Sequence, residues 1–110
     1  MTELKIVDLT KEMVQSFNIV LGEDSQEIKA FAMEQSRKLA TCLVRIGELS
    51  AKNEIDQETA QRMLEIEKLA VESVCLTISG LKQSSINNML TTALTIVKPI
   101  VNSKLGWLLI

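Results

Sequence analysis

The sequence predicts an all-α fold, and three observations point to it. Helix breakers are rare: the chain has one proline and four glycines in 110 residues. Aromatic residues make up only 3% of the chain, whereas strands draw heavily on aromatic side chains. Apolar residues recur three and four positions apart along most of the length, which is the spacing of one helix face. We therefore expect a helical bundle that forms a single domain over residues 1–110.

The first predicted helix covers about residues 3–21. Its apolar stripe is formed by Met13, Val14, Phe17 and Val20. Gly22 follows at the C′ position, where glycine often ends a helix. Asp24 or Ser25 then caps the second helix, and Glu27 completes a capping-box pattern with Asp24.

Two heptad segments, at about 25–51 and 56–81, predict a long antiparallel hairpin. The seam of the first steps through Ile28, Ala32, Gln35, Leu39, Cys42, Ile46 and Leu49. The seam of the second steps through Ala60, Leu64, Glu67, Val71, Val74, Ile78 and Leu81. Because only a short polar turn separates them, the two helices must fold back on each other. Asp56 is a good N-cap for the second one.

A C-terminal helix is predicted over about residues 84–98. We expect it to be kinked or ended near Pro99, because proline lacks an amide hydrogen and clashes with the preceding turn. Whether this helix continues directly from the one before it stays open at the level of sequence.

Charge is distributed unevenly along the chain. All 14 acidic residues lie at or before Glu72, and beyond it the only charged side chains are Lys82, Lys98 and Lys104. Residues 1–82 thus form a charged hairpin part, and residues 83–110 form a neutral, apolar part. Since solvated helix faces normally carry mixed charge, we expect the neutral part to be an interface.

Within residues 83–110 an apolar stripe and a polar stripe are expected on opposite helix faces. The apolar interface residues are Ile86, Leu90, Ala93, Val97 and Ile100, followed in the tail by Trp107 and Leu108. The polar stripe contributes Asn88, Thr91 and Thr95. Asparagine and threonine are mediocre helix residues, so their presence favours a helix with neighbours on both faces.

Several chemistries are disfavoured by composition. The chain has no histidine, which removes histidine-based catalysis and most zinc sites, so we expect no enzyme and no cofactor. Cys42 and Cys75 are expected to be free thiols, because the hairpin register separates them by about 12 Å along the axis. The same register places Glu67 opposite Cys42. A net charge of −2 disfavours binding to nucleic acid.

The favoured function is a non-enzymatic helical interaction protein that self-associates through residues 83–110 or binds a helical partner. Two alternatives stay open. One is a membrane-active or membrane-associated protein, pore-forming, lesion-forming or peripheral, using residues 83–110; the other is a small metal-binding protein using Cys42 and Glu67. Acidic residues near the N-terminus disfavour a secretory signal. We therefore expect cytoplasmic synthesis without a signal peptide, with membrane association left open.

Overall fold

A computed structural model describes residues 4–22, 25–78 and 80–110 of the chain. Within these ranges the regular structure consists of four α-helices: α1 (Ile6–Leu21), α2 (Gln26–Ala51), α3 (Gln57–Cys75) and α4 (Gln83–Leu105). The predicted all-α helical bundle is confirmed. The predicted helix start at residue 3 lies outside the described residues.

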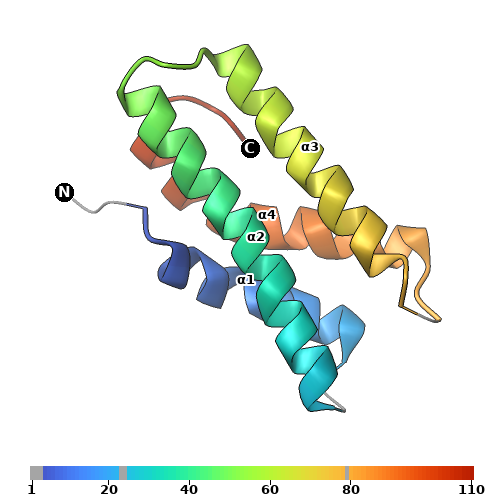
Figure 1. The fold of residues 1–110 in the computed structure, drawn as a ribbon. Helices are drawn as coiled ribbons and strands as arrows, with labels where there is room; N and C mark the ends of the chain where they lie inside the picture. Colours follow the sequence, from blue (N-terminus) through green and yellow to red (C-terminus); the bar gives the residue numbers. More distant parts are fainter. Residues whose placement is uncertain (1–3, 23–24, 79) are drawn as a thin grey trace.

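The four helices form two layers. α2 and α3 lie side by side and run in opposite directions, while α1 and α4 lie behind them (Figure 1). α1 packs against both α2 and α4, whereas α3 has its main contact with α2. The core therefore forms where α1, α2 and α4 meet, and α3 lies at the edge of the bundle.

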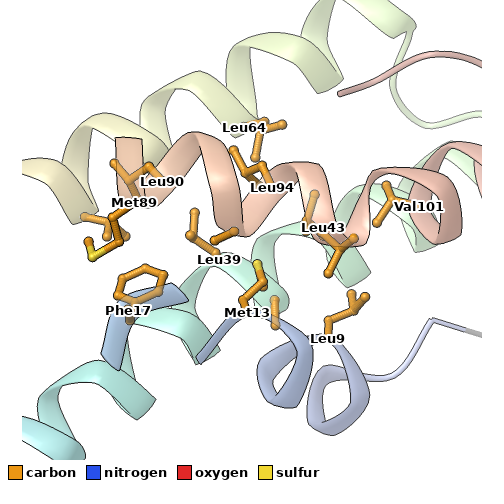
Figure 2. Close-up of a cluster of buried hydrophobic side chains, with 14 of the residues drawn as sticks. Leu9, Met13, Phe17, Leu39, Leu43, Leu64, Met89, Leu90, Leu94 and Val101 are labelled. Carbon is orange, nitrogen blue, oxygen red and sulfur yellow. The ribbon is translucent and has the colours of Figure 1, made fainter. Parts of the chain in front are cut away.

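The core is aliphatic, apart from one aromatic ring. Leu9, Met13 and Phe17 are spaced by four residues and so lie along one face of α1. All three are at most 1% exposed. Figure 2 shows them pointing toward side chains of α2 and α4, with Phe17 beside Met89. α4 contributes seven buried residues: Ile86, Met89, Leu90, Ala93, Leu94, Val97 and Val101. α3 contributes only four: Ala60, Leu64, Val71 and Cys75.

Residues close to the helix ends set three of the boundaries as predicted. The Ser25 hydroxyl caps α2 by accepting a hydrogen bond from the Ile28 amide at 3.1 Å. The Asp56 carboxylate caps α3 by accepting from the Thr59 amide at 2.7 Å. Gly22 follows α1, and its amide donates to the Asn18 carbonyl at 2.8 Å. The predicted capping box involves Asp24, which lies outside the described residues.

α3 ends at Cys75, earlier than the predicted end at residue 81. The hydrogen bonds tighten after this point, because the amides of Thr77 and Ile78 donate to carbonyls three residues back, each at 3.1 Å. The Thr77 hydroxyl also donates to the Val74 carbonyl at 2.6 Å. α3 and α4 are therefore separate helices.

α4 does not end near Pro99 but continues to Leu105. The proline removes the hydrogen bond that the Thr95 carbonyl would otherwise accept. Pro99 and Thr95 are both exposed, so water can reach that side of the helix. Val97 and Val101 on the opposite side are fully buried and hold the helix against the core. α4 instead ends at Gly106, which adopts the left-handed conformation that glycine takes without strain (φ 81°).

Candidate functional site

The ten predicted interface residues fall into two groups. Four of them, Ile86, Leu90, Ala93 and Val97, lie in the core of the chain and are at most 2% exposed. Their apolar stripe packs against the other helices of the same molecule. These side chains are thus occupied within the chain and do not form a free surface.

The remaining six predicted residues lie at or near the surface. Asn88, Thr91, Thr95 and Ile100 are exposed on α4, Trp107 is half-buried, and Leu108 is 75% exposed. We define the α4 outer face as Asn88, Thr91, Thr92, Thr95, Ile96 and Ile100, all of which are exposed.

Sequence reasoning missed Thr92 and Ile96 on this face. A strict alternation of three and four residues keeps a period of 3.5, whereas the helix turns every 3.6 residues. With the true helical period, residues 92 and 96 fall on the same side of the helix as residue 88. A helical-wheel plot of residues 86–101 would therefore have placed Thr92 and Ile96 on the exposed face.

The α4 outer face continues onto α1. A hollow of about 100 Å³ lies between the two helices and is lined by Ser16, Ile19, Val20, Asn88, Met89 and Thr92. Ile19 at its edge is 83% exposed, more than any other large hydrophobic residue among those described. Ile19 therefore lies on one continuous surface with Asn88 and Thr92. We define the α1–α4 patch as Ile19 together with the α4 outer face.

The polar side chains of α4 have separate roles. The Thr95 hydroxyl donates to the Thr91 carbonyl at 2.7 Å, so its hydrogen-bonding capacity is met within its own helix. Asn102 holds the C-terminal tail instead. Its side-chain oxygen accepts from the amides of Leu109 at 2.9 Å and Ile110 at 3.1 Å, and its amide donates to the Ile110 carbonyl at 3.2 Å. This clasp brings Leu109 to 8% exposure.

A second hollow separates α2 from α3. It has a volume of about 340 Å³ and is lined by Lys38, Thr41, Cys42, Arg45, Met63, Ile66 and Glu67. The predicted proximity of Cys42 and Glu67 is confirmed, since both line this groove. Both cysteines are free thiols, as predicted.

The chemistry of the two thiols follows from burial. Desolvation, with a smaller contribution from the Glu67 charge, raises the pKa of Cys42 to about 11. Desolvation also raises the pKa of Cys75 to about 11, against the opposing charge of Lys38. Both thiols are therefore protonated at neutral pH, and a protonated thiol is a poor nucleophile and metal ligand. The described residues contain no group of three cysteine, aspartate or glutamate side chains placed to hold a metal ion.

No protein-family model, curated protein or solved structure matches the chain. In the described part of the chain, none of the helices combines the length and apolar character needed to cross a bilayer.

Proposed function

We propose that this protein is a non-enzymatic helical interaction protein that associates with a second copy of itself through the α1–α4 patch. The observation that carries the proposal is the chemistry of this patch. It presents Ile19, Ile96 and Ile100 at 83%, 39% and 49% exposure among uncharged asparagine and threonine side chains. Ile96 and Ile100 are one helical turn apart on α4, and Thr92 lies between Ile96 and Ile19 along the same surface. A row of exposed apolar groups favours a protein contact, whereas scattered ones need no explanation.

The lack of acidic residues on α4 supports a second copy as the partner. In a twofold contact each residue of the patch meets the same surface of the other molecule, so like charges would oppose one another. Lys98 is the only charged side chain between Asn88 and Ile100, so a twofold contact brings few like charges together. The hollow beside Ile19 also offers a recess for an apolar side chain of the second molecule.

The test is the molar mass of the full chain in solution at micromolar concentration, measured by light scattering. We expect a dimer for the wild type and a monomer for Ile19→Arg, whose site is exposed enough to accept the change without unfolding. Leu69→Arg on α3 is the matched control, because Leu69 is 53% exposed and lies outside the patch. A monomeric wild type would refute the proposal. Dissociation by Leu69→Arg but not by Ile19→Arg would move the interface to α3.

Membrane association through the tail is the second candidate. Leu108 is 75% exposed beside the half-buried Trp107, and Lys104 lies four residues before Leu108 in the chain. An aliphatic residue with tryptophan and lysine nearby is the combination that binds membrane interfaces. We expect Leu108→Ser to reduce co-flotation with anionic vesicles. A wild-type chain that stays wholly soluble in the presence of vesicles would remove this candidate.

We also propose two details of the fold. One is the heptad pairing of α2 with α3, and the other is a bend of α4 at Pro99. Support for the pairing comes from the Cys42 thiol on α2, which lies 3.8 Å from the Met63 carbonyl oxygen on α3. Support for the bend comes from the hydrogen bond that Pro99 cannot make on the outer side of α4.

A further inference from the structure

The groove between α2 and α3 has the size and lining of a small-ligand site. Its volume of about 340 Å³ falls at the lower end of the range of about 300–1,000 Å³ that is typical of small-molecule pockets. The lining is mostly apolar, with charged side chains at the rim. The groove lies outside the α1–α4 patch, so it stands independently of self-association.

The apolar part of the groove is built from Cys42, Met63 and Ile66. The Cys42 thiol lies 3.8 Å from the Met63 carbonyl oxygen, which brings the two helices together at the floor. Ile66 also lines the groove and is 67% exposed. Methionine is unbranched and polarizable, and it adapts to apolar ligands of different shape. Together these residues offer a surface for a hydrocarbon chain.

The charged side chains give the groove two different ends. α2 and α3 run in opposite directions (Figure 1), and Cys42 lies opposite Met63. Arg45 therefore lies toward the start of α3, and Glu67 lies one turn beyond Met63 in the other direction. The negative charge of Glu67 already acts on the Cys42 thiol. Lys38 lies at the same end as Glu67, so that end carries one charge of each sign, whereas Arg45 is the only charged lining residue at the other end. An anion is thus favoured at the Arg45 end.

Arg45 is also available for a ligand. The ion pairs among the described residues are Lys38–Glu34, Arg62–Glu58 and Lys68–Glu65, and none of them involves Arg45. Lys38, the other cation at the rim, lies two helical turns away and 4.0 Å from a Glu34 carboxylate oxygen. A guanidinium group matches a carboxylate with two parallel hydrogen bonds, which an ammonium group cannot do.

We propose that this groove binds a single-chain aliphatic carboxylate, with its carboxylate on Arg45 and its chain over Cys42, Met63 and Ile66.

The test uses dodecanoate, added to the full-length chain below the concentration at which it forms micelles. Methyl NMR of Met63 and Ile66 should show saturable shifts with one molecule bound per chain, and calorimetry should give the affinity. Arg45→Gln should weaken binding about tenfold, because a charge-assisted bidentate contact is lost. Ile66→Ser should weaken it about fivefold through lost apolar contact. Arg37→Gln is the matched control, since Arg37 is exposed on α2 but does not line the groove.

A related ligand tests the role of the carboxylate. Dodecanol has the same chain without the charge and should bind about tenfold more weakly than dodecanoate. The proposal is overturned if no shift saturates, if Arg45→Gln binds dodecanoate as the wild type does, or if the methyl groups of Ile19 and Ile100 shift in step with Ile66.

Discussion

α3 and α4 are built in opposite ways. α3 carries six charged side chains in 19 residues, begins at a charged cap and leaves Ile66, Leu69 and its C-cap residue Leu76 between 44% and 67% exposed. α4 has no acidic residue, begins at Lys82 without a side-chain cap and buries seven residues against the rest of the bundle. Of these two helices, the one without acidic residues is therefore packed more deeply, and the charged one lies at the edge.

This difference shows that a lack of charge can have more than one cause. α4 needs few charges on the side that packs against α1, because water does not reach that side. Its outer face is exposed, however, and is still neutral apart from Lys98. Burial within the chain explains one face of α4, and only the other face calls for a partner.

The largest expected effect compares the same truncation in the two helices. Leu90 in α4 is 2% exposed and Leu64 in α3 is 6% exposed. We expect Leu90→Ala to lower the free energy of unfolding by about 4 kcal/mol and Leu64→Ala by about 2.5 kcal/mol, because a cavity at the edge of the bundle relaxes more easily than one in its centre. Urea unfolding of both variants measures this difference. Equal losses would show that α3 is as central to the core as α4.

A smaller effect concerns the way the two helices end. α4 is followed by the tail that Asn102 clasps with three hydrogen bonds. Asn102→Ala should lower stability by about 2 kcal/mol and should speed amide hydrogen exchange at Leu109 and Ile110. Asn88→Ala, at an exposed position on the same helix, should change stability by less than about 0.5 kcal/mol. Unchanged exchange at Leu109 would mean that packing alone holds the tail.

The smallest expected effect concerns the way the two helices begin. Hydrogen bonds from Thr59 lower the pKa of Asp56 below its ordinary value. The stabilisation is complete above the ordinary value of about 4 and is lost as the pH falls through the lowered pKa of the folded state. The wild type should therefore lose stability relative to Asp56→Asn as the pH falls below about 4, since the asparagine cap does not titrate. The first amides of α3, but not those of α4, should exchange faster in acid.

Local features of this fold could be predicted from the sequence. These features are the caps at Ser25 and Asp56, the end of α1 at Gly22 and the end of α2 at Ala51. Each depends on residues within a few positions of the boundary. The proximity of Cys42 and Glu67 was also predictable, because a short turn leaves few registers for two helices.

Two helix boundaries could not be predicted in the same way. Heptad spacing continues through Ile78 and Leu81, yet α3 ends at Cys75, where the amide hydrogen bonds change to carbonyls three residues back. Pro99 is typical of a helix end, yet α4 continues, because Val97 and Val101 are anchored in the core and the lost hydrogen bond faces water. In α4, packing against the rest of the bundle therefore outweighed the local effect of the proline.

For the candidate interface, too, the sequence determines one part of the answer and the fold determines the other. Helical spacing and composition already determine that this chain is a bundle of helices, and they identify the apolar face of α4. They do not determine what covers that face, because a helix of the same chain and a partner molecule can bury an apolar stripe equally well. Tertiary packing buried Ile86, Leu90, Ala93 and Val97 within the bundle, and it left Ile19, Ile96 and Ile100 exposed. The hydrophobic effect depends on the area removed from water and not on the molecule that removes it, so only the three-dimensional arrangement separates core from surface.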